Sequence, residues 1–84
     1  MKTIRLSGHA REQLARRGVT EAEVMAAIHE AEWQPGERGR LECRLEFVFN
    51  DVWDKKQYTT KPVRPIFVEK ATEILVVTVY RYFY

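Results

Sequence analysis

The sequence predicts an α+β fold in the order β-α-α-β-β-β, with two N-terminal helices packed on an antiparallel sheet. Helix caps and 3.6-residue apolar spacing occur in the first third of the chain, whereas alternating apolar and polar residues occur in the second half. A chain of 84 residues is expected to form one domain with a small core, so we assign residues 1–84 to a single unit.

A short strand and a first helix are predicted at the N-terminus. Lys2–Leu6 alternates polar and apolar side chains, as expected of a strand. Ser7 can cap the following helix because its hydroxyl can accept a hydrogen bond from the first turn. Gly18 suits the left-handed residue that ends a helix, and Arg16 and Arg17 lie favourably beside the negative end of the helix dipole.

A second helix is predicted from Thr20 to Ala31. Thr20 and Glu23 have the spacing of a capping box, in which each residue's side chain bonds the other's backbone amide. The apolar residues recur at i, i+3, i+4 and i+7 and form one stripe: Val24, Ala27, Ile28 and Ala31. This helix is therefore expected to pack one face on the core.

The clearest predicted strand is Leu41–Phe49. The preceding segment, Trp33–Arg40, contains one proline and two glycines and is expected to be an exposed connection. From Leu41 to Phe47, apolar residues alternate strictly with charged ones, which indicates one buried face and one solvated face. The residues expected to point inward are Leu41, Cys43, Leu45, Phe47 and Phe49.

The remaining chain is expected to form a loop and two strands. Asn50–Thr60 is rich in turn formers and charges and is predicted to be a loop. Pro62 and Pro65 are expected to prevent a central strand from beginning before Ile66. Strands are then predicted at Ile66–Lys70 and Glu73–Tyr84, and the second, apolar on both faces, is placed in the middle of the sheet.

Charge is unevenly distributed although the net charge is only +2. Residues 1–17 contain five Lys or Arg and one acid, residues 18–37 contain five acids and no Lys or Arg, and residues 55–84 contain six bases and two acids. If the two basic regions share a face, they form the surface expected of a polyanion-binding protein. Chance clustering of surface charge in a short chain explains the pattern equally well.

No cofactor or metal is expected. Cys43 is the single cysteine, which excludes an internal disulfide and suits a reducing compartment. The two histidines are far apart, and no Cys/His/Asp cluster has the spacing of metal ligands. The chain has no apolar run long enough for a membrane span and no signal-peptide core, so the expected location is the cytoplasm.

Helix one and the last strand contain the candidate site residues. His9, Gln13 and Arg16 lie at i, i+4 and i+7 and would share a helix face that could hold a phosphate and assist proton transfer. The alternative is that His9 only packs at the helix start. In the last strand, Thr78, Tyr80, Tyr82 and Tyr84 share one face and Arg81 points to the other. Such a strand could stack bases and bind phosphates, or simply use aromatic strand formers.

Several of these residues carry a resemblance to a known family. The runs His9-Ala10, Arg17-Gly18-Val19-Thr20 and Val24–Ile28, with Leu14 between the first two, resemble the signature of a small bacterial family of unknown function. Its final strand, of the form Val-Val-Thr-Val-Tyr, is similar to Val76–Tyr80 here. The family is placed near the RelE/ParE and BrnT toxins. It commonly has arginine at the position of Gln13.

The resemblance implies a RelE/ParE-like fold and a toxin of a toxin–antitoxin pair, inhibited by a cognate antitoxin. The toxin would act as a metal-independent endoribonuclease or translation inhibitor, with a ribose 2′-OH attacking the adjacent phosphate of RNA. Such a reaction needs a base, an acid and cations for the developing charge. The implied catalytic residues are His9, Arg17 and Tyr80. The implied RNA- and phosphate-binding residues are Arg16, Gln13 and Arg81.

Two other functions are compatible with the same residues. The domain could be a non-catalytic module that binds a protein or RNA, with His9 and Arg17 maintaining the helix turn. It could also be a gyrase-directed relative in the ParE manner, which would bind an antitoxin without cleaving RNA. Homodimerisation through the aromatic C-terminal strand is a physical alternative to an antitoxin partner.

Overall fold

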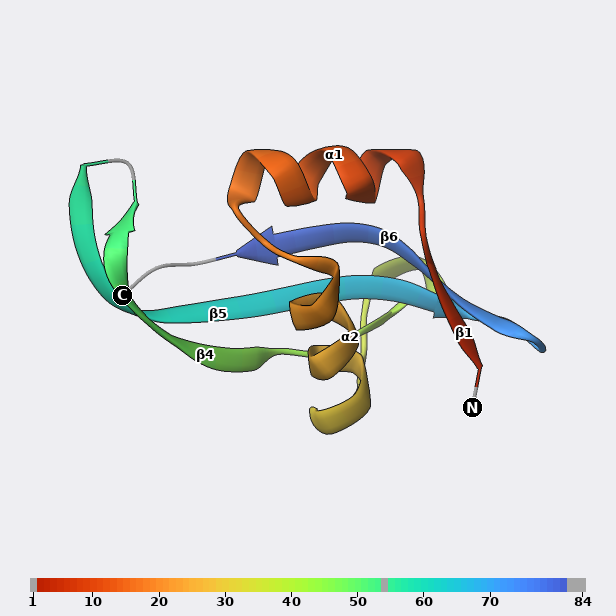
Figure 1. Ribbon diagram of the computed structural model, residues 1–84. Coiled ribbons are helices and arrows are strands. Elements are labelled where there is room, and N and C mark those ends of the chain that lie inside the picture. The colour runs from red at the N-terminus through yellow and green to blue at the C-terminus, as the bar shows by residue number, and fades with distance from the viewer. Residues whose placement is uncertain (1, 54, 82–84) are drawn as a thin grey trace.

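Two helices cover one face of a mixed β-sheet, which confirms the α+β class (Figure 1). The computed structural model describes residues 2–53 and 55–81. The elements in chain order are β1 (Thr3–Leu6), α1 (Gly8–Arg17), α2 (Glu21–Glu30), β2 (Gln34–Pro35), the 3₁₀ turn η1 (Glu37–Gly39), β3 (Leu41–Glu42), β4 (Leu45–Trp53), β5 (Lys56–Glu69) and β6 (Glu73–Arg81). The strand order is β1-β6-β5-β3-β2, and β4 also pairs with β5.

The prediction of a purely antiparallel sheet is wrong. β1 runs parallel to β6, in a register from Thr3–Glu73 to Leu6–Val76, whereas all the other pairs are antiparallel. The parallel pair arises because α1 and α2 carry the chain across the sheet before the meander begins. β6 does lie between β1 and β5, as expected, although β1 covers only its first four residues. Tyr82 and Tyr84 lie outside the described residues.

The predicted loop at Asn50–Thr60 is also wrong, because most of it belongs to a long hairpin. β5 begins at Lys56 and pairs with β4, with Trp53 opposite Lys56 at the tip. The turn-forming residues produce a bulge instead of a loop: the register shifts between Val48 and Asp51, where Asn50 has a left-handed φ of 47°. Two threonines and a tyrosine in residues 56–60 favour the extended backbone that this pairing requires.

The two prolines lie inside β5, so the expectation that no strand begins before Ile66 is wrong. Pro65 lies opposite the gap between β3 and β4, where Cys43 donates its amide to the Pro65 carbonyl at 3.3 Å. The proline nitrogen has no hydrogen to donate in return. The predicted strand Leu41–Phe49 is therefore divided at residues 43 and 44 but keeps one register. Pro62 lies one residue beyond the last β5–β6 pair, Val63 with Arg81.

The helix boundaries confirm the predicted caps. Ser7 accepts from the Ala10 amide at 3.1 Å, and Gly18 ends α1 with φ 63° and ψ 38°. Thr20 and Glu23 form both bonds of the capping box, at 2.9 and 3.1 Å.

The core between helices and sheet consists mainly of small and β-branched side chains around one buried phenylalanine: Leu6, Ala10, Leu14, Val19, Val24, Ala27, Ile28, Cys43, Val63, Phe67, Ile74, Val76 and Val79.

Trp33 closes one end of this core. Its indole nitrogen donates to the Ile28 carbonyl at 2.8 Å, and its ring meets Phe67 edge-on at 5.0 Å. The Trp33 side chain therefore packs against the core of its own domain.

No helix in residues 2–53 and 55–81 combines the length and the apolarity needed to cross a membrane.

Two buried cations attach the α1–α2 turn to the sheet, and we call this arrangement the turn clamp. The ammonium of Lys61, on β5, donates to the Gly18 carbonyl at 2.8 Å and to the Glu23 carboxylate at 2.7 Å. The guanidinium of Arg81, on β6, donates to the Arg17 carbonyl. Because these carbonyls belong to the negative end of α1, both cations also interact favourably with the helix dipole.

Removal of Lys61 is predicted to destabilise the domain strongly. Its side chain is only 7% exposed, so Lys61→Met would leave the Glu23 carboxylate and the Gly18 carbonyl without their cation. We expect the free energy of unfolding, measured in urea, to fall by about 2 to 3 kcal/mol. Lys70→Met is the control, because the Lys70 ammonium lies 3.8 Å from Glu73 at an exposed site and its loss should cost less than about 0.5 kcal/mol. Equal losses of unfolding free energy in the two variants would contradict the proposed stabilising role of the turn clamp.

The turn clamp also predicts loss of stability in acid. Burial tends to raise the pKa of Glu23, but hydrogen bonds from Lys61 and Thr20 and the Lys61 charge outweigh it and hold the pKa below 4.5. A carboxyl whose pKa is lowered by folding stabilises the protein fully above its ordinary pKa, and the stabilisation disappears as pH falls through the folded pKa. The free energy of unfolding in urea, measured from roughly pH 6 down to pH 3, should therefore fall less for Glu23→Gln than for the parent protein.

Glu73→Gln is the matched control for this pH dependence. The Glu73 pKa is also lowered, chiefly by the hydrogen bond from Arg5, but this pair lies at the surface. Added salt should therefore screen the contribution of Glu73 to stability, whereas that of the half-buried Glu23, paired with the buried Lys61, should persist. If the free energy of unfolding of Glu23→Gln fell at low pH as much as that of the parent protein, the prediction would be contradicted.

Candidate functional site

Tyr80 lies against two arginines from different elements. Arg64, its direct cross-strand partner on β5, places its guanidinium carbon 5.0 Å from the centre of the Tyr80 ring. Arg17, the last residue of α1, places its guanidinium carbon 5.4 Å from the same ring. Both contacts are within the range of cation–π attraction. The ring therefore holds two cations in one place, and Tyr80 itself is half-buried.

The turn clamp fixes the position of Arg17. Its backbone carbonyl is held by Arg81, and the left-handed Gly18 immediately after it reverses the chain. This arrangement leaves the Arg17 side chain free to reach Tyr80. Arg17 and Tyr80, which the family resemblance assigns together to one site, are thus brought into contact.

Arg81 lies on the other side of β6 from Tyr80, as the strand alternation predicted. It is 7% exposed, and its guanidinium faces the α1–α2 turn. Burial lowers the pKa of Arg81 to about 10, partly offset by nearby Glu23, so it remains charged at neutral pH. The structure therefore gives Arg81 a positioning role in the turn clamp.

Gln13 also faces the protein and not the solvent. Its side-chain oxygen accepts from the Val79 amide at 2.8 Å and from the Thr78 hydroxyl at 2.5 Å. β1 pairs with β6 only as far as Val76, so beyond it the edge of β6 is covered by α1. Gln13, 7% exposed, supplies the acceptor that a neighbouring strand would otherwise provide.

The expected His9–Gln13–Arg16 face is therefore divided. Gln13 turns to the sheet edge, while His9 and Arg16 remain exposed. The helical wheel placed Gln13 on the solvent face because it could not show that α1 lies alongside the edge of β6. His9 lies eight residues before Arg17, which corresponds to roughly 12 Å along the helix axis.

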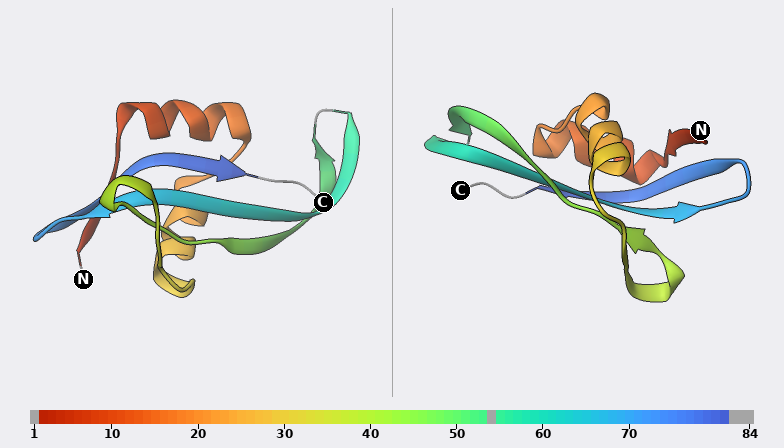
Figure 2. Two further views of the ribbon diagram at one scale, coloured as in Figure 1. Left: turned by 180° about the vertical axis from the view of Figure 1, so that it is seen from behind. Right: turned by 90° about the horizontal axis from the view of Figure 1, so that it is seen from below.

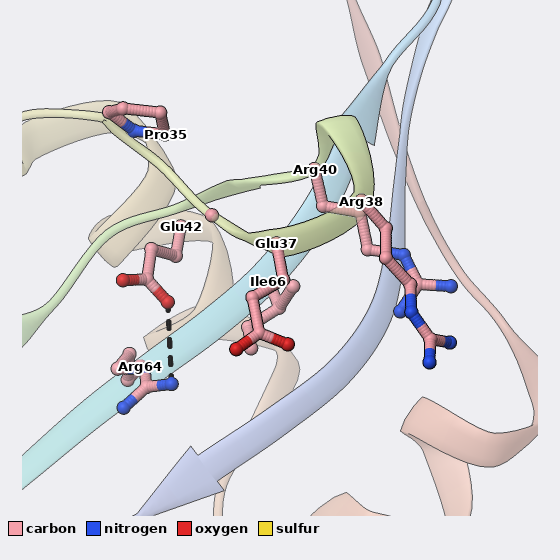
Figure 3. Close-up of a pocket in the computed structure, with 8 residues that line it drawn as sticks. Pro35, Glu37, Arg38, Arg40, Glu42, Arg64 and Ile66 are labelled. Atoms are coloured by element: carbon pink, nitrogen blue, oxygen red, sulfur yellow. Dashed lines mark ion pairs between the residues drawn. The ribbon is translucent and has the colours of Figure 1, made fainter.

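The segment from β2 to β3 projects from the face of the sheet opposite the helices (Figure 2). It borders a hollow of about 580 Å³ that no pattern in the sequence predicted. Glu42 and Arg64 form an ion pair of 3.3 Å at one side of the hollow, and Arg38 and Arg40 extend from the turn at the other (Figure 3). The lining residues are Pro35, Gly36, Glu37, Arg38, Arg40, Glu42, Arg64 and Ile66.

Arg64 joins this hollow to the Tyr80 contact, because it belongs to both. We call the combined surface the helix-free face: Arg17, Arg38, Arg40, Arg64 and Tyr80, with Glu37, Glu42 and Ile66. The available signal in the sequence was the pair Arg38 and Arg40 flanking Gly39. This pair did not predict a site, because a segment rich in Pro and Gly indicates only an exposed connection.

The described residues contain no group of three or more His, Cys, Asp or Glu arranged to hold a metal ion.

One comparison with known proteins gives a match. The family model described as "Domain of unknown function (DUF4258)" matches residues 6–81, which include every residue of the helix-free face and of the turn clamp. Neither curated proteins nor solved structures yield a significant match.

The edge-capping role of Gln13 is testable. Gln13→Ala would leave the buried Val79 amide without its acceptor, so we expect a loss of about 2 kcal/mol in the free energy of unfolding. Amide hydrogen exchange at Val79 should accelerate in the same variant. Glu12→Ala, at the exposed neighbouring position, should change stability by less than about 0.5 kcal/mol. Unchanged exchange at Val79 in Gln13→Ala would contradict the role.

Proposed function

The chain belongs to the family described as "Domain of unknown function (DUF4258)", and we propose that it binds RNA as the toxin of a toxin–antitoxin pair. The observation that carries the proposal is the placement of Arg17 and Arg64 at 5.4 and 5.0 Å from one tyrosine ring. Two guanidinium groups held together on a partly exposed surface form a site for a phosphodiester, because phosphate oxygens accept charge-assisted hydrogen bonds from arginine. Arg17 is the proposed main ligand, and Arg64, which also pairs with Glu42 at 3.3 Å, adds positive charge beside it.

The same surface suits single-stranded RNA. Unpaired bases stack on aromatic rings and on guanidinium planes, and the Arg17–Tyr80–Arg64 cluster offers both. The two basic regions of the sequence contribute one arginine each, Arg17 and Arg64. Their meeting at Tyr80 favours a polyanion-binding surface over chance clustering of charge.

In the catalytic form of this proposal, a ribose 2′-OH attacks the adjacent phosphorus and the P–O5′ bond breaks. Arg17 and Arg64 stabilise the charge that develops on the phosphate oxygens, and the Tyr80 hydroxyl protonates the leaving oxygen. His9 is the proposed base, with Arg16 as an additional phosphate ligand. Since His9 lies roughly 12 Å along α1 from Arg17, the scissile phosphate would lie between them at the edge of β6.

A non-catalytic RNA-binding module is the second candidate, and one observation favours it. Arg81 and Gln13 are bonded to the protein, so the residues left for chemistry are fewer than the resemblance implies. This candidate uses the same helix-free face and differs only in leaving the RNA intact. A gyrase-directed toxin would likewise leave RNA intact.

The antitoxin is proposed to cover the β4–β5 hairpin. Val48 and Val52 on β4 are 84% and 54% exposed, which is unusual for apolar side chains on an ordered strand. A second copy of the chain is the alternative occupant of this surface. A cytoplasmic location and a RelE/ParE-like arrangement of the sheet belong to the same proposal.

Expression of the chain alone in a bacterial host tests this function. We expect growth arrest and new cleaved ends in total RNA, and both should be lost in Arg17→Ala and Tyr80→Phe. Loss of two phosphate contacts should weaken RNA binding at least tenfold in an Arg17→Ala, Arg64→Ala double variant. The matched control is Arg11→Ala, because Arg11 lies on the same helix but pairs with Glu21 at 2.6 Å, away from Tyr80.

The outcomes separate the candidates. Arrest with intact RNA would favour a gyrase-directed toxin. Normal growth with RNA binding that depends on Arg17 and Arg64 would establish the non-catalytic module. A purified parent protein that fails to bind single-stranded RNA would refute the proposal in both forms.

A further inference from the structure

The turn beside the hollow has an arginine, Arg38, in a left-handed backbone conformation that favours glycine. Arg38 has φ 58° and ψ 35°, and Gly39 follows with φ 72°. The turn is closed by the Gly36 amide donating to the Arg40 carbonyl at 2.7 Å and by the Arg40 amide donating to the Glu37 carbonyl at 3.1 Å. A left-handed conformation disfavours arginine relative to glycine. The backbone at residue 38 would therefore accept glycine at least as readily as arginine.

Arg38 and Arg40 also have no partner for their charge among the described residues. Both guanidinium groups extend from the turn in the same direction (Figure 3), and neither has a hydrogen bond or ion pair with any residue in 2–53 or 55–81. Two cations that line one hollow repel each other, and an anion bound between them removes that repulsion. Phosphate is the anion that matches paired guanidinium groups best.

The rest of the hollow suits a planar, hydrogen-bonding group. Glu37 and Ile66 both line the hollow. The described residues give the Glu37 carboxylate no ion pair or hydrogen-bond partner, unlike the Glu42 carboxylate, which pairs with Arg64 (Figure 3). Ile66 and Pro35 supply apolar surface for a ring to lie on. A volume of about 580 Å³ is within the range of small-molecule sites.

We propose that the hollow binds one nucleotide of the RNA, with its phosphate on Arg38 and Arg40 and its base on Ile66 beside Glu37. The preferred base is guanine, because its N1–H and N2–H₂ groups are adjacent donors that a carboxylate can accept together, whereas adenine has no N1–H. This inference rests on the proposed RNA binding. Because Arg64 belongs to both the hollow and the Tyr80 contact, the neighbouring phosphate of the RNA would lie at Arg17 and Arg64.

Calorimetric titration of the whole chain with GMP, IMP and AMP tests the proposal. We expect GMP to bind about tenfold more tightly than AMP, with IMP between them because it keeps N1–H and lacks the 2-amino group. Glu37→Gln should abolish the preference for GMP over AMP. Arg38→Gly should weaken binding of all three nucleotides at least about fivefold without lowering the melting temperature, since glycine accepts the backbone of residue 38.

The control variant is Arg44→Gly, which removes an exposed arginine outside the hollow and should leave nucleotide affinity unchanged. No saturable binding of GMP, or equal affinity for GMP and AMP, would overturn the inference. RNA binding that requires Arg17 and Arg64 but not Arg38 would also overturn it while leaving the proposed function intact. Conversely, if the protein bound GMP but failed to bind single-stranded RNA, the hollow would be supported as a nucleotide site and the proposed function would be refuted.

Discussion

The attachment of the α1–α2 turn to the sheet is the constraint on which the rest of the structure depends. Lys61 and Arg81 lie on neighbouring strands, and both donate to carbonyls at the end of α1. These carbonyls need donors because the helix ends there and the turn lies against the core. Glu23 balances one of the two buried charges and also caps α2. One cluster therefore ends the first helix, starts the second and docks both on the sheet.

The helix-free face follows from this arrangement. Arg17 reaches Tyr80 because its own carbonyl is fixed by Arg81, the residue after Tyr80 in β6. Gln13, one turn earlier, keeps α1 along the edge of β6 through the Val79 amide. The residues that resemble the family signature are thus divided between two tasks: some hold the helices against the sheet, and Arg17 and Tyr80 remain available to a ligand.

Four arginines and two glutamates make up the charged side chains of the helix-free face. The acids of α2 lie on the helix side, whereas the arginines of the hollow lie on the other side of the sheet. Glu37 and Glu42 lie among these arginines, and Glu42 is paired with Arg64, so four positive charges face two negative ones. The helix-free face is therefore positive although the net charge of the chain is only +2. The net charge of the whole chain therefore understates the positive charge of this one surface.

The sequence alone determined the local features whose energies depend on near neighbours. The Ser7 cap, the Thr20–Glu23 capping box, the left-handed Gly18 and the alternation of residues 41–47 were all predicted, because each is decided within a few residues. What the tertiary structure decided required partners distant in the chain. Pro65 is tolerated in β5 because the β3–β4 gap lies opposite it, and Gln13 is buried because β1 leaves the edge of β6 uncovered. Arg38 and Arg64 likewise line one hollow only because the β2–β3 segment folds over β5, which no local pattern specifies.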